Sequence, residues 1–135
     1  MQNHTAKLAA AGRLLIAILF LLSGVGKIAA PAMTQGYIAS AGLPLPMLSL
    51  IAAIVIEVGG GVLLVLGYQT RIVALALSAF TVLAALAFHH DFADQNQMIH
   101  FLKNIAITGG LLQVAAFGAG AFSLDARRAR TLPAS

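Results

Sequence analysis

Long apolar stretches alternate with short polar ones along this chain. The apolar stretches cover residues 8–30, 47–67, 71–89 and 98–120. Each has roughly the 20 residues that a helix needs to cross the hydrocarbon core of a bilayer. Lipid offers no partner for backbone polar groups, and the chain lacks the strict apolar/polar alternation of a membrane barrel. We therefore expect an all-α bundle of four transmembrane helices in a single domain, residues 1–135.

The connections between the apolar stretches predict how the helices are joined. Residues 31–46 contain several prolines and predict a short interfacial segment, helical or re-entrant. The connection at residues 68–71 is so short that its two helices must be antiparallel. The first stretch could be a signal peptide, but no clear cleavage site follows it, so we expect an uncleaved helix. Residues 121–135 form a basic tail.

Composition supports an integral membrane protein. The chain has 135 residues, of which 60% are hydrophobic and 9% charged, whereas soluble domains have about 45–50% apolar and about 25% charged residues. It has no cysteine, which excludes thiol–disulfide exchange and thiolate-ligated metal clusters within this chain. The net charge of +4 does not indicate nucleic-acid binding, because the positive residues flank the apolar stretches.

The distribution of positive charge predicts the orientation in the membrane. The opposing loops contain no Lys or Arg and carry Asp91 and Asp94. Positive residues favour the cytoplasmic side, so we expect both termini in the cytoplasm. The lysines and arginines on the cytoplasmic side are Lys7, Arg13, Arg71, Arg127, Arg128 and Arg130.

Glu57 is the only charged residue between Met47 and Gly67. It lies 11 residues beyond Pro46, which is roughly 16 Å along a helix. An ionisable group at that depth usually faces protein or water and has a partner. Lys27 and Lys103 are the candidate partners, since both are predicted near the outer end of a helix.

The helical spacing places other polar groups beside this carboxylate. Ser23 and Lys27 share a face, as do His100, Lys103 and Asn104. Glu57 also lies on a stripe of small residues at four-residue spacing, which allows another helix to approach closely. The predicted buried polar cluster therefore consists of Lys27, Glu57, Lys103, Asn104 and His100. We expect the cytoplasmic half to be nearly free of buried charge.

Simpler interpretations of the same residues remain open. A lysine near a helix end is often an interfacial anchor, and a buried Glu–Lys pair can serve packing alone. His89 and His90 at a loop edge are typical of solvated surface residues. We predict no metal site, and haem ligation by these histidines is disfavoured because they lie near the membrane surface.

Several short motifs give the chain a resemblance to a known family. In the first apolar stretch they are Gly12-Arg13-Leu14-Leu15 through Phe20 and Ser23-Gly24-Val25-Gly26-Lys27. In the next loop and stretch they are Tyr37, Gly42-Leu43-Pro44, Glu57-Val58-Gly59-Gly60-Gly61 and Leu66-Gly67-Tyr68-Gln69-Thr70-Arg71. In the remainder they are Phe88-His89-His90-Asp91-Phe92, Gln97, Phe101-Leu102-Lys103-Asn104, Gly109-Gly110-Leu111-Leu112 and Ser123-Leu124-Asp125. In this order and spacing, over residues 12–125, the chain resembles the DoxX family of small bacterial membrane proteins.

The resemblance implies a four-helix protein of the bacterial cytoplasmic (inner) membrane. The family name comes from subunits associated with quinone-linked oxidation of sulfur compounds, and some relatives are linked to oxidoreductase or oxidative-stress assemblies. The resemblance thus suggests quinone as a ligand and redox proteins as partners, in addition to the lipid bilayer. It implies that four residues of this chain occupy motif positions of the family: Lys27, Glu57, Lys103 and Asn104. It implies no catalytic role for them, and the chain encodes no cofactor motif of its own.

Three functions are compatible with this sequence. The first is a membrane subunit or anchor of a redox-linked, quinone-associated assembly. The second is a structural or scaffolding membrane protein whose buried charges only fix helix packing. The third is a proton-coupled carrier that uses Glu57, for which a homodimer would have to supply the missing wall. We favour the first over the second and place the carrier last.

The predicted orientation can be tested with single-cysteine variants, because the native chain has no cysteine. We expect a cysteine at Asn96 to react with a membrane-impermeant maleimide only from the periplasmic side, and a cysteine at Ala129 only from the cytoplasmic side. The reverse pattern would show that the charge distribution had been misinterpreted.

Overall fold

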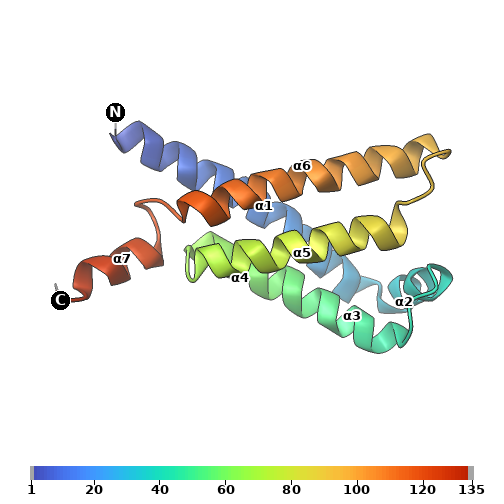
Figure 1. The fold of residues 1–135 in the computed structure, drawn as a ribbon. Helices are drawn as coiled ribbons and strands as arrows, with labels where there is room; N and C mark the ends of the chain where they lie inside the picture. Colours follow the sequence, from blue (N-terminus) through green and yellow to red (C-terminus); the bar gives the residue numbers. More distant parts are fainter. Residues whose placement is uncertain (1, 134–135) are drawn as a thin grey trace.

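Helices account for all regular secondary structure in residues 2–133, the part of the chain that this computed structural model describes (Figure 1). In chain order they are α1 (Gln2–Ala29), α2 (Pro31–Ser40), α3 (Pro46–Ile54), the π-helical turn η1 (Val55–Gly59), α4 (Gly60–Leu66), α5 (Thr70–Phe88), α6 (Gln95–Phe117) and α7 (Leu124–Thr131). Within these described residues, four helices are long and apolar enough to cross a membrane: α1, the continuous α3–η1–α4 helix, α5 and α6. The predicted all-α bundle of four transmembrane helices is confirmed.

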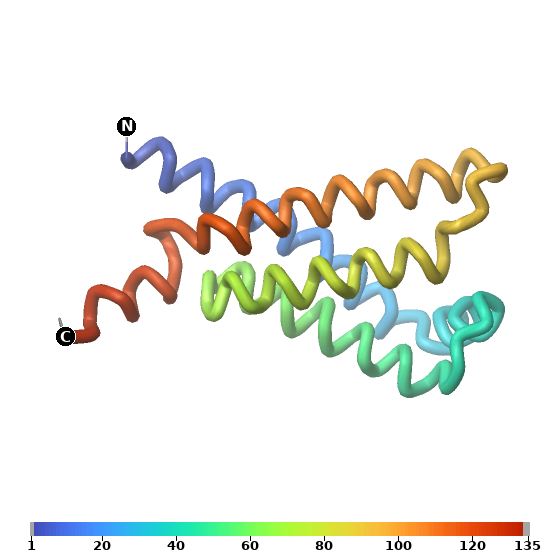
Figure 2. The backbone as a smooth tube through the Cα atoms, in the orientation of Figure 1, coloured from blue at the N-terminus to red at the C-terminus, as the bar shows by residue number. Residues whose placement is uncertain are grey.

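The chain runs back and forth along one axis, and both ends of the trace lie at the same end of the bundle (Figure 2). The α4–α5 turn is also at that end, whereas α2 and the α5–α6 connection lie at the opposite end (Figure 1). The expected interfacial segment is the short helix α2. We call the two ends the terminal end and the α2 end.

Local chemistry determines where the helices begin and end. Pro31 and Pro46 are the first residues of α2 and α3, a position that needs no amide hydrogen. Gly67 ends α4 in the left-handed conformation, with φ of 65°, which glycine adopts without steric cost. At the start of α6, the Asp94 side chain accepts hydrogen bonds from two backbone amides of the first turn.

The apolar core lies in the half of the bundle nearer the terminal end. Ala17 and Phe20 of α1 meet Leu64 of α4 and Leu77 of α5 there. These side chains are buried although the outward faces of the same helices carry exposed leucines and isoleucines, as expected for a surface that faces lipid. Close packing of the four helices is therefore concentrated in this half.

Arg13 is buried in the same half, with 2% of its surface exposed. Its guanidinium donates hydrogen bonds to the carbonyl oxygens of Leu64, Val65 and Phe122. The first two carbonyls lie at the C-terminus of α4, where unpaired carbonyl oxygens and the helix dipole favour a cation. The expectation that this half would be nearly free of buried charge is wrong, because these carbonyls replace the water that Arg13 loses.

The segment that follows α6 is hydrogen-bonded to the turn between α4 and α5. Asp125 accepts hydrogen bonds from the backbone amides of Gln69 and Thr70, and its own amide donates to Gly67 O. Burial raises the pKa of Asp125, but these hydrogen bonds and the charge of Arg128 outweigh it and leave the pKa below its usual value. The stabilisation is therefore present at neutral pH and is lost as the pH falls through that lowered pKa.

Replacing Arg13 tests this arrangement. Arg13→Met leaves the carbonyl oxygens of Val65 and Phe122 without this donor and leaves Leu64 O with only the Gly67 amide, and we expect it to lower the free energy of unfolding in detergent by about 2–3 kcal/mol. Arg127→Met is the matched control, because Arg127 is exposed, and it should melt like the wild type. Equal stability of both variants would contradict a structural role for Arg13.

Candidate functional site

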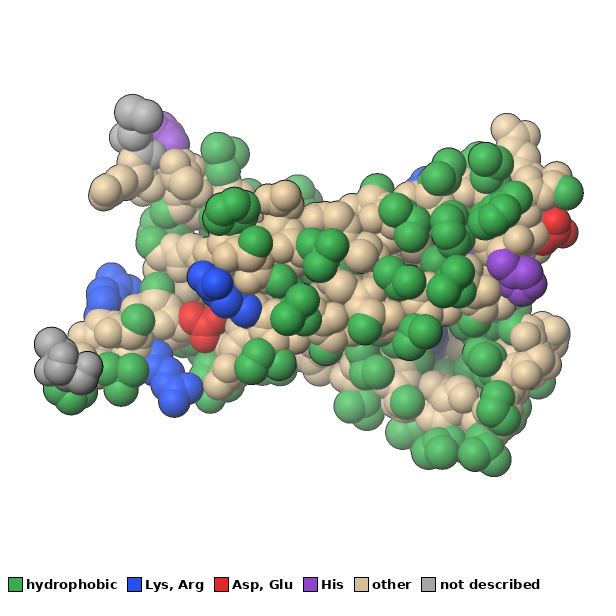
Figure 3. Space-filling view, viewed as in Figure 1, with side chains coloured by type: hydrophobic (Ala, Val, Ile, Leu, Met, Phe, Trp, Pro, Cys, Tyr) green, Lys and Arg blue, Asp and Glu red, His purple; other side chains and the backbone are tan. Residues whose placement is uncertain are grey.

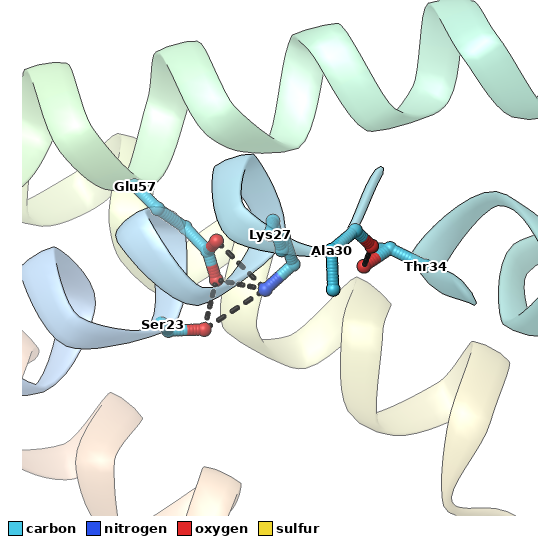
Figure 4. Close-up of polar contacts among 5 residues, drawn as sticks. All are labelled: Ser23, Lys27, Ala30, Thr34 and Glu57. Carbon is cyan, nitrogen blue, oxygen red and sulfur yellow. Dashed lines mark hydrogen bonds and ion pairs between the residues drawn. The ribbon is translucent and has the colours of Figure 1, made fainter. Parts of the chain in front are cut away.

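Glu57 lies in the middle of the π-helical turn η1 and is 5% exposed. Lys27 Nζ is 2.8 Å from Glu57 Oε2 and donates a 3.1 Å hydrogen bond to Oε1 (Figure 4). Ser23 Oγ donates to the same Oε1 at 3.0 Å and accepts from Lys27 Nζ at 2.9 Å. The three side chains form a closed triangle between α1 and η1, which we call the Ser–Lys–Glu cluster.

Gly24 allows α1 to come close enough for this cluster to form. A β-carbon on Gly24 would lie 2.5 Å from Val58 Cγ2 and 3.3 Å from Glu57 Cβ, so any larger residue would push α1 away from η1. Ser23 and Lys27 lie one turn apart on α1, on either side of this contact. Close helix approach at small residues is typical of membrane bundles.

The geometry leaves part of the cluster's hydrogen-bonding capacity unused. Glu57 Oε2 is buried and forms an ion pair with Lys27, but no aligned hydrogen bond reaches it from the described residues. An ammonium has three N–H donors, and Lys27 uses two of them, toward Ser23 and Glu57 Oε1. The Lys27 side chain is 25% exposed and that of Glu57 is 6% exposed, so the lysine is the more accessible partner of the ion pair.

A cavity of about 1300 Å³ opens beside the cluster in the half nearer the α2 end. Its walls are largely apolar and come from α1, α2, α3, α5 and α6, and Ser23, Lys27 and Glu57 line its polar part. Small-molecule sites combine apolar walls with a few placed polar groups in this way. The cavity can therefore hold an apolar molecule that carries a polar head.

A second polar wall of the cavity comes from α6. It presents His100, Lys103 and Asn104, all of which line the same cavity as Glu57. The imidazole rings of His89 and His100 stack with their centroids 5.0 Å apart. Burial, and secondarily the charge of His100, lowers the pKa of His89, so His89 is predominantly neutral at pH 7.

All five predicted site residues line this one cavity, and the ion pair found among the described residues joins two of them, Lys27 and Glu57. Lys27, not Lys103, pairs with Glu57, and Lys103 has no ion pair within the described residues. That α1 supplies the partner depends on packing at Gly24, which sequence spacing does not specify. The π-helical turn was not predicted either, and Ala53, Glu57 and Gly61 are all buried at a spacing that fits an uninterrupted α-helix equally well.

Comparison with known proteins defines the family. The DoxX family matches residues 8–90 of the chain, which include most of α1 and all of η1 and α5. The chain belongs to the DoxX family. It is similar to the inner membrane protein YqjF of Escherichia coli K12, with 43% identity over 84% of this chain and 85% of the relative. It is also similar to the inner membrane protein YphA of the same organism, with 39% identity over 85% and 86%. No solved structure matches the chain.

This DoxX-family chain is thus a multi-pass protein of the inner membrane. The family match includes both partners of the Lys27–Glu57 pair and ends before Lys103 and Asn104. The Ser–Lys–Glu cluster therefore lies within the part of the chain that the family match covers.

Breaking the ion pair should destabilise the fold. Glu57→Gln leaves Lys27 partly buried without a counter-charge, and we expect a loss of about 2–3 kcal/mol in detergent, below the roughly 3–5 typical of fully buried pairs because Lys27 is partly exposed. Adding Lys27→Met to Glu57→Gln should recover part of this loss, whereas adding Lys103→Met should not. If Lys103→Met rescues equally well, the assignment of the partner is wrong.

Proposed function

We propose that this DoxX-family protein is a membrane subunit of a redox-linked assembly that binds quinone in the cavity beside Glu57. The observation that supports the proposal is the Ser–Lys–Glu cluster at the polar end of a large apolar cavity. A quinone has the same two parts, a ring bearing carbonyl oxygens and an apolar tail. A bound quinone would supply redox chemistry in which two electrons and two protons are exchanged together.

The unused hydrogen-bonding groups fit such a ligand. A carbonyl oxygen needs a donor, and one N–H of Lys27 makes no aligned hydrogen bond within the cluster, although the nitrogen is 2.8 Å from Glu57 Oε2. A quinol hydroxyl needs an acceptor, and Glu57 Oε2 receives no aligned hydrogen bond. In this proposal Lys27 binds and orients the ring oxygen, and Glu57 holds or releases the proton that accompanies electron transfer.

The electrons require a partner protein. The chain has no cysteine to hold a thiolate-ligated cluster, and in this proposal a partner of the assembly donates or accepts the electrons. We propose that both termini face the cytoplasm, which places the cavity in the periplasmic half of the membrane. Quinone exchange would then occur with the outer leaflet.

A structural role for the cluster is the second candidate. Ser23, Lys27 and Glu57 already bond to one another without a ligand, as expected of a pair that fixes helix packing. The two candidates differ for the Lys27→Met plus Glu57→Met double variant. A purely structural pair predicts a stable protein with unchanged cellular redox function, whereas a quinone site predicts a stable protein that has lost it.

Photolabelling tests the proposed ligand. A photoreactive quinone added to inner-membrane vesicles should label this protein, and excess unlabelled quinone should compete. Ala84→Phe fills the cavity that Ala84 lines and should lower labelling at least about fivefold, the effect of losing roughly 1 kcal/mol of apolar contact.

The matched control is Ala106→Phe, at an exposed α6 position outside the cavity lining, which should label like the wild type. Labelling that is equal in both variants, or that unlabelled quinone fails to reduce, would contradict a quinone site in this cavity.

A further inference from the structure

Positive charge is concentrated at the terminal end of the bundle without matching acids. Arg127, Arg128 and Arg130 of α7 are exposed, as is Arg71 at the start of α5. In Figure 3 most of the visible Lys and Arg side chains gather at the end that carries α7. The chain has four acidic residues, and the one at this end, Asp125, is bonded to backbone amides of Gln69 and Thr70.

The α7 helix is held in place and is not a free tail. Arg13 binds Phe122 O, and Asp125 joins the helix to the α4–α5 turn through both its side chain and its amide. The spanning helices α4, α5 and α6 end or begin at this level, at Leu66, Thr70 and Phe117. The arginines of α7 therefore start where the hydrocarbon core gives way to lipid head groups.

A small pocket adjoins this basic end. It has a volume of about 460 Å³ and lies between the start of α5 and the loop that connects α6 to α7. The Arg71 guanidinium lies directly over Gly118 of that loop, where a β-carbon would be 3.4 Å from Arg71 Nε. Arg71 has no ion pair among residues 2–133. The pocket thus has the size of a small-molecule site and an uncompensated guanidinium in its wall.

Exposed aromatic rings surround the same region. Phe117 lines the pocket and is 79% exposed, and Phe122 is 53% exposed. Aromatic residues beside basic ones at a membrane boundary are typical of contacts with lipid, with the ring among the acyl chains and the cation at the head group.

We propose that this pocket binds the phosphate head group of an anionic phospholipid. Arg71 binds the phosphate, the arginines of α7 supply attraction at longer range, and Phe117 packs against the acyl chains. Asp125 also lines the pocket, but it is one negative charge beside the four positive charges of Arg71, Arg127, Arg128 and Arg130, so this end keeps a net positive charge. This site is separate from the cavity beside Glu57 and does not depend on the function proposed for it.

Lipid binding can be measured directly on the purified protein. In neutral detergent, we expect phosphatidylglycerol to be retained in native mass spectra and to raise the melting temperature, and phosphatidylcholine to do neither. Arg71→Gln should weaken phosphatidylglycerol binding about fivefold, the factor that corresponds to one cation near an anionic surface. Without lipid it should melt like the wild type, because Arg71 is exposed.

The matched control is Lys7→Gln, which removes one positive charge from the exposed start of α1, outside the pocket. It should bind phosphatidylglycerol like the wild type. Equal weakening by Lys7→Gln and Arg71→Gln would overturn the proposal, since binding would then reflect net charge and not a site.

Inorganic phosphate distinguishes a lipid from a free anion. At millimolar concentration it should leave phosphatidylglycerol bound, because it lacks the acyl chains that contact Phe117. Displacement of the lipid by phosphate alone would overturn the lipid assignment, and so would equal binding of phosphatidylglycerol and phosphatidylcholine by the wild type.

Discussion

The position of α1 depends on neutralising a carboxylate deep in the membrane. Glu57 can remain charged at that depth only if a cation and hydrogen-bond donors replace water, and Lys27 and Ser23 provide them. Both lie on α1, so the ion pair fixes the rotation and the height of that helix against η1. Gly24 makes the contact sterically feasible. Side-chain chemistry and backbone proximity therefore specify the same helix pairing.

A second polar contact holds α1 at the terminal end of the bundle. Arg13 reaches across to the carbonyl oxygens at the end of α4, about four turns of α1 away from Lys27. Between the two contacts, Ala17 and Phe20 pack into the apolar core. Because polar contacts hold α1 at both Arg13 and Lys27, the helices can pack tightly in the half nearer the terminal end. The half nearer the α2 end can then contain the cavity.

The sequence predicts the spanning helices, because these follow from the length and apolar composition of each stretch. It also predicts that Glu57 needs a partner, because a carboxylate at that depth is costly. It could not choose between Lys27 and Lys103, which have similar predicted depths on different helices. Packing decides that choice. From the sequence, Arg13 contributes only to the predicted orientation in the membrane, because a basic residue near a helix end is usually solvated or interfacial. Gly67 at the predicted end of its helix was the sequence signal for a helix C-terminus, the kind of position that attracts a cation.

The order of the groups along the cavity constrains how a ligand could exchange a proton with Glu57. Glu57 lines the cavity, but its side chain is 6% exposed against 25% for Lys27, so Lys27 is the more accessible member of the pair. In the proposed quinone site, a proton would reach the carboxylate past Ser23 and Lys27, and movement of the lysine would widen this route. The long lysine stem allows such a movement toward the α2 end without displacing α1, because its methylene groups can remain against apolar walls. Glu57 would then face the ligand directly, without the ammonium between them.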